Sequence, residues 1–264
     1  MVRHVTGGAA GPLAQLPRWV SLVRAPNPGP MTLDGTNTWL LRAPHASECL
    51  VIDPGPLIEE HLVEVAGRCP VGTVLATHAH PDHVEGLPRF RELAGLAEVE
   101  SPAEFSAAGG IRIRTLVTPG HTADSVCFLA EYEDERVVFT GDTILGRGTT
   151  VVAHPDGDLG DYLDSLRHLA LLGPVPVLPG HGPALDSCVD AASFYLDHRL
   201  GRLAQIRGAR EAGALTSMDI VERVYADVDR LLWPAADLSV RAQLAYLDRV
   251  DRESAPPSAP LDPP

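Results

Sequence analysis

The chain has 264 residues and a formal net charge of −14, from 21 basic and 35 acidic residues. This length suits one or two domains with a substantial core, and no apolar run approaches the roughly 18 residues of a transmembrane helix. A carboxylate-rich surface repels phosphate backbones, so we expect no tight nonspecific binding to DNA, although bound dications would still allow a nuclease.

The N-terminal part of the chain predicts a lead-in followed by three strands. Residues 1–17 are rich in Gly, Ala and Pro, and we expect them to be flexible. Short apolar runs predict strands at residues 19–23, 39–41 and 50–52. Asp53 follows the third strand, where it is either a turn residue or a carboxylate that orients a metal-binding histidine.

A helix and a histidine cluster come next. Apolar spacing predicts a helix over residues 57–66 that buries Leu57, Leu62, Val63 and Ala66. The following apolar run leads into Thr-His-Ala-His-Pro-Asp-His at residues 77–83. Imidazole nitrogen and carboxylate oxygen are ligands that zinc prefers, so the cluster predicts a metal site; the alternative is a solvated, His-rich loop.

A second helix is expected over residues 84–94, directly after this cluster. Asp82 and His83 would then lie at its N-terminal end, where the helix dipole favours an anionic Asp82. Strict alternation of apolar and polar residues predicts a strand at residues 111–116. A hairpin is expected from residues 125–132 and 136–140, around an acidic turn.

Three downstream segments repeat one arrangement, an apolar run and a glycine next to a ligand-type residue. They lead into His121, Asp142 and His181. The glycine frees the backbone at each turn. Four strand ends would thus bring five histidines and two aspartates to one sheet edge. The predicted ligands are His78, His80, Asp82, His83, His121, Asp142 and His181.

This ligand set predicts two zinc ions per chain. The first would be held by His78, His80 and His121, and the second by Asp82, His83 and His181. Asp142 would bridge them, because a carboxylate has two oxygens and a negative charge. A hydroxide shared by the metals would attack a carbonyl carbon or a phosphorus, with Asp82 helping to orient it. No serine or cysteine nucleophile is required.

The rest of the chain is predicted to be mostly helical. Residues 161–172 form an amphipathic helix, with Tyr162, Leu163, Leu166, Leu169 and Ala170 inward. No metal-type cluster follows residue 190. Helices are expected over residues 194–212, 217–225 and 238–250, the second of them capped at Thr216.

Four motifs in this order carry a resemblance to the metallo-β-lactamase superfamily: THAHPDH, TPGHT, TGDT and PGHG. Longer motifs resemble its lactamase-beta-like 2 branch over about residues 24–249: NPGPMTLDGTNTWL, GDTILGRGTTVV, DYLDSL, PGHGP and YLDHR. The resemblance implies an α/β fold, a four-layer αββα sandwich over residues 18–190. It also implies that Asp53 orients a ligating histidine.

The same resemblance implies a small helical, winged-helix-like domain over residues 191–252. The alternative is a helical cap that merely packs on the sandwich. Residues 253–264 are rich in Ser, Ala and Pro, and we expect a disordered tail there.

Five residues are weaker candidates for substrate contacts. His198 and Arg199 lie in the helix after the PGHG loop, where an arginine beside a dimetal centre would bind a phosphate or carboxylate. Ordinary helix surface is the alternative for both. Asn37, Thr149 and Thr150 lie in loops that could line the cleft. The histidines outside the motifs are expected at the surface: His4, His45, His61, His154 and His168.

Three functions remain open from the sequence. The first is a zinc-dependent hydrolase of a small-molecule ester, thioester or lactam. The second is a single-strand-specific endoribonuclease, an activity that the lactamase-beta-like 2 branch includes. RNA binding would need aromatic residues interleaved with basic ones, and the C-terminal part offers few. The third, a mononuclear-iron persulfide dioxygenase, is disfavoured by the complete second ligand group. The oligomeric state is left undecided.

The cysteines and the N-terminus bear on location. Four cysteines are widely spaced, Cys49, Cys69, Cys127 and Cys188, and each adjoins or lies in an apolar run. We expect buried free thiols in a reducing cytoplasm. Residues 1–8 lack the apolar core of a secretory signal, which also favours a cytoplasmic protein.

Overall fold

The computed structural model describes residues 10–96 and 103–254, which form two mixed sheets. The first has the order β1 (Val20–Arg24), β2 (Asn37–Leu41), β3 (Cys49–Ile52) and β4 (Val71–Leu75). The second has the order β5 (Glu104–Ala107), β6 (Ile111–Val117), β7 (Val126–Tyr132), β8 (Glu135–Gly141) and β9 (Val177–Pro179). Only the β3–β4 and β8–β9 pairs of these strands are parallel.

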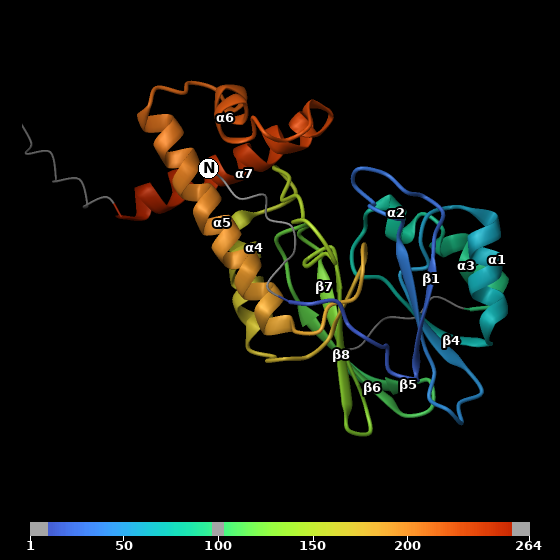
Figure 1. Ribbon diagram of the computed structural model, residues 1–264. Helices are drawn as coiled ribbons and strands as arrows, with labels where there is room; N and C mark the ends of the chain where they lie inside the picture. Colours follow the sequence, from blue (N-terminus) through green and yellow to red (C-terminus); the bar gives the residue numbers. More distant parts are fainter. Residues whose placement is uncertain (1–9, 97–102, 255–264) are drawn as a thin grey trace, which may run out of the picture.

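Helices cover the outer face of each sheet, as Figure 1 shows. The first sheet is covered by α1 (Glu59–Arg68) and α3 (Leu87–Ala94), and the four-residue α2 (Pro81–Val84) precedes α3. The second sheet is covered by α4 (Leu159–Ala170) and α5 (Cys188–Glu211). The predicted αββα layering is therefore confirmed.

Strand alternation explains these layers, because successive side chains of a strand point to opposite faces. In β7, Phe128 packs between the two sheets, while Cys127 and Leu129 pack towards α4. Trp39 and Phe139 meet edge to face between the sheets, with ring centroids 5.9 Å apart. Both faces of the second sheet are thus buried.

Two helix predictions need correction. In α1 the buried residues are His61, Leu62 and Val65, whereas Leu57 and Val63 are exposed. Leu57 lies before α1 begins at Glu59. The predicted helix started two residues too early, which is why Leu57 was expected to face inward. The expected helix over residues 84–94 is broken at Gly86, whose N–H donates to the carbonyl of Gly55.

This break changes the argument for Asp82. A four-residue helix has only a small dipole, so α2 gives Asp82 little stabilisation of the kind a long helix gives. The anionic form of Asp82 is instead favoured by its contact with His181, described below.

The cysteine prediction is half wrong. Cys49 and Cys69 form a disulfide that joins the start of β3 to the end of α1. Cys127 and Cys188 are free and buried, as predicted. The disulfide removes the cysteine argument for a reducing compartment. Within the described residues, no helix is long and apolar enough to cross a membrane.

The C-terminal helices continue directly from the sandwich. α5 begins before the predicted boundary at residue 190 and packs along α4. It is followed by α6 (Ser217–Val224), the short 3-10 helix η1 (Arg230–Leu232) and α7 (Trp233–Ser254). Thr216 caps α6 in a reciprocal capping box with Asp219, which confirms the predicted helix start.

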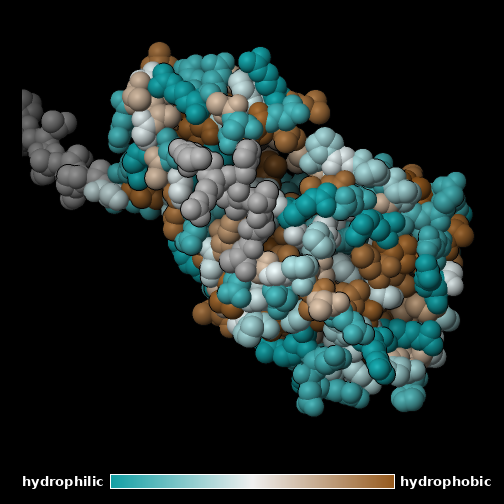
Figure 2. All heavy atoms as spheres, viewed as in Figure 1, coloured by the Kyte–Doolittle hydropathy of each residue, from teal (hydrophilic) through white to brown (hydrophobic). Residues whose placement is uncertain are grey.

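The predicted lead-in and tail lie partly outside the described residues, which exclude 1–9 and 255–264. The described part of the lead-in packs on the sandwich: Ala10 is buried, and the N–H of Leu13 donates to the carbonyl of Ala184. On the face shown in Figure 2, hydrophilic residues follow the outer edge at α1, in keeping with the exposed acidic side chains of that helix.

Candidate metal centre

The predicted ligands converge because their strands end at one edge of the sandwich. β4 leads into Thr77 and His78, while β6, β8 and β9 lead into the other three loops. Backbone hydrogen bonds join the two sheets at this edge: Val126 donates to Thr77, and Asn37 donates to Gly180. The two halves of the ligand set therefore face each other.

The first group contains three histidines, His78, His80 and His121. His80 Nδ1 lies 3.0 Å from His78 Nε2 and 3.1 Å from His121 Nε2. Two nitrogens bound tetrahedrally to one zinc at about 2.0–2.1 Å would lie about 3.3–3.4 Å apart. The ring nitrogens are thus spaced as donors to a single ion would be.

The second group contains Asp82, His83 and His181. His181 Nε2 lies 3.1 Å from Asp82 Oδ2 and 3.3 Å from His83 Nε2. His83 is fully buried, and Asp82 is partly exposed. This group offers two imidazoles and a carboxylate that also reaches solvent.

Asp142 lies between the two groups. Its Oδ1 is 3.4 Å from His181 Nε2 and 3.5 Å from His83 Nε2, and its Oδ2 is 3.8 Å from His121 Nε2. Oδ1 is buried and has no hydrogen-bond partner with good geometry. A buried carboxylate oxygen costs free energy unless it is paired or binds a metal. Asp142 therefore fits the bridging position.

Hydrogen bonds fix which nitrogen of His83, His121 and His181 faces the centre. The Nδ1–H of His121 donates to the carbonyl of Val151 at 2.7 Å, and that of His181 faces the carbonyl of Gly35 at 3.3 Å. His83 Nδ1 donates to Asp53 Oδ2 at 2.9 Å. With Nδ1 used in this way, Nε2 is left free as a metal ligand. The residues present thus fit a pair of divalent ions.

Asp53 is buried directly behind this centre. It accepts the N–H of Thr77 at 2.7 Å, the hydroxyl of Thr77 at 2.8 Å and the Nδ1–H of His83. The hydroxyl of Thr77 in turn lies 3.1 Å from His78 Nδ1. Asp53 therefore contacts the first group through Thr77 and the second group through His83, and these contacts fit a carboxylate that orients ligating histidines.

Replacing Asp53 by asparagine is expected to weaken zinc binding by about 10- to 100-fold, the usual loss when a partner of a ligating histidine is changed. The amide of Asp53→Asn cannot accept from Thr77 and His83 in the same way. Zinc affinity can be measured by competition with a chelator. Asp219→Asn is the matched control, because Asp219 also accepts two backbone N–H groups, but in α6. Equal effects of both changes would contradict the orienting role.

The side chains of the centre shift one another's pKa values. Burial and the neighbouring His83 lower the pKa of His78 to about 2. Burial opposes protonation of His181, but its contacts with the carboxylates of Asp142 and Asp82 raise its pKa to about 9. Burial alone would raise the pKa of Asp142, yet His83 and His181 hold it well below the usual range. The pKa is therefore raised at His181 and His83 of the second group and lowered at His78 and His121 of the first.

Of the five weaker candidates, Thr150 alone contacts a candidate ligand, as described below. Asn37 is fully buried, and its amide donates to the carbonyls of Pro179 and Gly182. His198 stacks on Phe194, with ring centroids 6.5 Å apart. Thr149 is half-buried in the same loop as Thr150. The predicted role of Asn37 as a cleft residue is replaced by that of a buried support for the His181 loop.

Arg199 and Thr150 contact each other under the first group. Arg199 is buried, and its guanidinium donates to the carbonyl of Thr150. The hydroxyl of Thr150 lies 3.3 Å from His121 Nδ1. Arg199 is therefore neither on the helix surface nor free to bind a substrate anion.

Other contacts to the centre had no clear signal in the sequence. The carbonyls of Gly35 and Val151 are backbone groups, so residue type does not reveal them. Thr77 was marked only by its place beside His78.

His61 was expected at the surface but is buried, with Nε2 3.0 Å from the hydroxyl of Thr38. His45, His154 and His168 are exposed as expected, and His4 lies outside the described residues.

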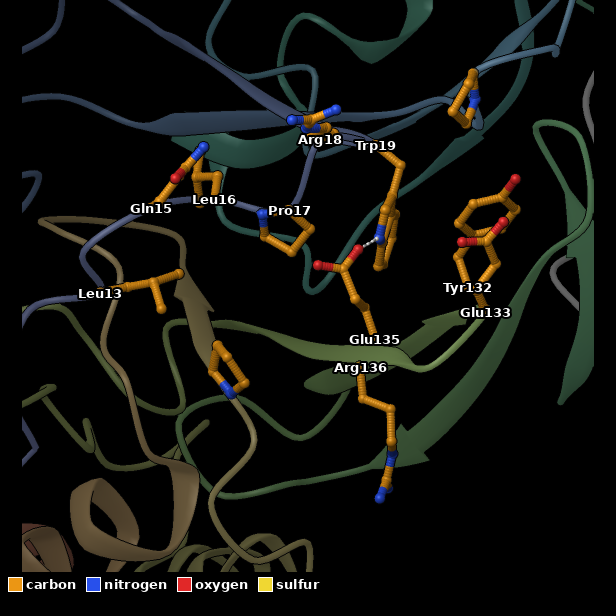
Figure 3. A pocket seen from close by; sticks show the side chains of 12 residues that line it. Leu13, Gln15, Leu16, Pro17, Arg18, Trp19, Tyr132, Glu133, Glu135 and Arg136 are labelled. Carbon is orange, nitrogen blue, oxygen red and sulfur yellow. Dashed lines mark hydrogen bonds between the residues drawn. The ribbon is translucent and has the colours of Figure 1, made fainter.

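An open pocket of about 650 Å³ lies elsewhere, beside the turn between β7 and β8. In Figure 3, Trp19 Nε1 donates to Glu135 across this pocket, at 2.8 Å. Arg136, which also lines it, pairs with Glu131. None of the predicted site residues lines this pocket, so its size does not make it the candidate site.

Known proteins are similar to this chain over most of its length. It is 33% identical over 249 residues to a beta-lactamase-like protein 2 homolog of Caenorhabditis elegans, covering 82% of this chain and 79% of that protein. It is 34% identical over 246 residues to an atrochrysone carboxyl ACP thioesterase of Aspergillus fumigatus, covering 79% and 75%. A beta-lactamase domain protein of Burkholderia ambifaria has the same fold, with a TM-score of 0.74 at 22% identity over 94% of this chain and 91% of that one.

Two domain families match the sequence directly. The beta-lactamase associated winged helix domain matches residues 216–254, which confirms the predicted type of C-terminal domain. The metallo-beta-lactamase superfamily matches residues 31–110 and 97–181, the segments that carry the candidate ligands. The chain therefore belongs to the metallo-beta-lactamase superfamily and is a metal-dependent hydrolase of that type.

Proposed function

We propose that the protein is a dinuclear zinc hydrolase that cleaves a carbonyl substrate of the ester or thioester type. The observation that carries this proposal is the position of Asp142, whose two oxygens face the two ligand groups. When bound, a pair of zinc ions would lower the pKa of a shared water and polarise the oxygen that gains charge.

Residues of the chain orient the candidate ligands and place two carboxylates for this reaction. Asp53, Gly35 and Val151 hold three histidines with Nε2 towards the centre. Asp82 is the ligand-type carboxylate that reaches solvent, so it is placed to orient an attacking water and to hold its proton. The other carboxylate, Asp142, is almost fully buried and supplies negative charge against the metals.

The contacts of Arg147, in a loop, and of Arg199, on α5, favour a carbonyl substrate over a phosphodiester. Arg147 lies one residue after Gly146, whose N–H donates to the carbonyl of His181. Its guanidinium forms a two-pronged ion pair with Asp34, at 2.6 and 2.8 Å. Arg199 is buried against Thr150. Both guanidinium groups therefore already bind protein acceptors. In this arrangement neither is available as a phosphate ligand.

The similarity to a fungal thioesterase supports the thioester member of this class. The test is turnover of three substrates by the zinc-loaded protein: an acyl thioester, a chromogenic cephalosporin and a single-stranded RNA. Thioester cleavage that is lost with the metals would support the proposal. RNA cleavage alone would replace it with the endoribonuclease function, and one iron per chain with persulfide oxidation would replace it with a dioxygenase.

The raised pKa of His181 predicts that the two groups bind zinc with different pH dependence. Its pKa of about 9 means that zinc must displace a proton below that pH, so affinity at the second group should rise at least about tenfold per pH unit from pH 7 to 9. The pKa values of His78 and His121 are lowered, so the first group should change less. Chelator competition at several pH values measures both; parallel slopes would contradict the prediction.

The same shift predicts the stability of the protein stripped of metal. A pKa raised from 6.5 to about 9 contributes stability that is fully present below pH 6.5 and lost as the pH rises to about 9. The Tm of the stripped protein should therefore fall over this range. Zinc should reverse the trend, because it replaces the proton on His181. A Tm that rises with pH in the stripped protein would contradict this assignment.

A further inference from the structure

Arg199 is a buried cation that the proposed chemistry does not use. It lies on α5 with 3% of its surface exposed, and no carboxylate in the described residues lies within ion-pair distance of it. Its Nε is buried without a hydrogen-bond partner. Burying a charge in this way costs free energy, so stability alone does not explain an arginine at this position.

The contacts of Arg199 lead to one metal ligand. Its terminal nitrogen donates to the carbonyl of Thr150, the residue before Val151. Val151 accepts the Nδ1–H of His121, and the hydroxyl of Thr150 lies 3.3 Å from the same nitrogen. The guanidinium therefore holds the carbonyl of Thr150, and the next carbonyl along the chain, that of Val151, orients the His121 ring.

Tyr162 supports Arg199 from α4. The guanidinium carbon lies 5.3 Å from the centre of the Tyr162 ring, and the Tyr162 hydroxyl donates to the carbonyl of Thr143, next to Asp142. The backbone before His121 also packs on this tyrosine, since a Cβ on Gly120 would lie 2.3 Å from the Cα of Tyr162. The buried Arg199–Tyr162 pair thus lies beneath two of the ligand loops.

We propose that Arg199 is a positioning residue for His121, through which α5 fixes the first ligand group. The inference rests on the proposed metal centre. Without the guanidinium, the segment from Thr150 to Val151 is no longer held at its first carbonyl, so the Val151 carbonyl can shift and Nε2 of His121 is no longer fixed towards the position shared with His78 and His80. Zinc affinity at that group should fall about 10- to 100-fold, the usual loss when the support of a ligating histidine is removed.

The matched control is Arg202, three residues further along α5. Its guanidinium also lies over a tyrosine, at 4.2 Å from the ring centre of Tyr225, and also donates to a backbone carbonyl, that of Val224. Neither Tyr225 nor Val224 contacts a ligand residue in the described structure. Arg202→Met therefore removes the same kinds of contact away from the metal centre.

The experiment is a two-site zinc titration against a chelator with wild type, Arg199→Met, Arg199→Lys and Arg202→Met. Arg199→Met is expected to weaken one site 10- to 100-fold and to leave the other within about threefold. Arg199→Lys should recover part of the loss, because an ammonium can still donate to Thr150. Arg202→Met should retain both affinities. Tm is measured for each variant, so that a folding defect is recognised.

A second readout does not require metal. In the NMR spectrum of the stripped protein, the Nδ1–H proton of His121 should be visible in wild type and Arg202→Met and lost in Arg199→Met. Unchanged affinities and an unchanged proton signal in Arg199→Met would overturn the inference. Equal weakening of both sites together with a lower Tm would also overturn it, in favour of a purely structural role. If wild type binds no zinc, the proposed function fails, and the proton signal still decides the role of Arg199.

Discussion

The Asp142→Ala variant is expected to lose about 10³-fold or more of its hydrolytic turnover. Asp142 is the carboxylate that faces both ligand groups, through Oδ2 towards His121 and through Oδ1 towards His83 and His181. Charge stabilisation by metals supplies several kcal/mol, and each 1.4 kcal/mol is a factor of ten in rate. Removing the bridge should therefore reduce metal content and turnover together.

Asp237→Ala is the matched control for this variant. Asp237 is also a buried aspartate with an unpaired oxygen, but it lies on α7 and pairs with Arg241. Its loss should lower stability without changing the zinc content. Elemental analysis and kcat are measured for both variants. Full turnover in Asp142→Ala would show that Asp142 does not bridge the metals.

The His121→Ala variant has the second largest expected effect. It removes one of three nitrogens of the first group and also breaks the hydrogen bond to Val151. The ion at this group should be lost, while the second group, with Asp82, His83 and His181, keeps its own ligands. Turnover should fall by about 10²-fold or more, because one metal cannot polarise the substrate as two do.

The zinc content of His121→Ala is expected to fall from about two to about one per chain. His154→Ala serves as the control, because His154 is exposed and makes no contact with the ligand residues in the described structure. Zinc per chain and kcat are determined on the same samples. Turnover at the wild-type level in His121→Ala would contradict the assignment of the first group.

The convergence of the candidate ligands was predictable because the sequence places each of them in the same local setting. Each ligand segment follows an apolar strand, and strands that run in the same direction end at one edge of a sheet. His78, His121 and His181 could therefore be placed together from residue order alone. The alternation of buried residues in β7 and the hairpin with β8 were equally visible, because a strand with two buried faces leaves a near-continuous apolar run.

What escaped prediction depends on contacts between distant parts of the chain. Cys49 and Cys69 are brought together by the parallel pairing of β3 with β4 and by the length of α1, and no local spacing indicates this. His61 is buried because α1 turns it towards Thr38 and the carbonyl of Pro54. The sequence marked it only as a histidine outside every motif.

Arg199 shows the same limit at the functional site. Its position after the PGHG loop suggested either the mouth of the site or ordinary helix surface, and the structure shows neither. Whether it points to the cleft or beneath the ligand loops depends on how α5 packs on α4, which places it against Tyr162 and Thr150. Side-chain direction on a helix follows from packing, and packing is not encoded in a short motif.

The central claim is that two zinc ions occupy the two ligand groups and carry out hydrolysis. The most direct test is elemental analysis of the purified, unmodified protein, with thioester turnover assayed before and after stripping and zinc readdition. About two zinc ions per chain, with turnover lost on stripping and regained as the second ion returns, is the predicted result. A single iron per chain, or turnover that persists without metal, would contradict it.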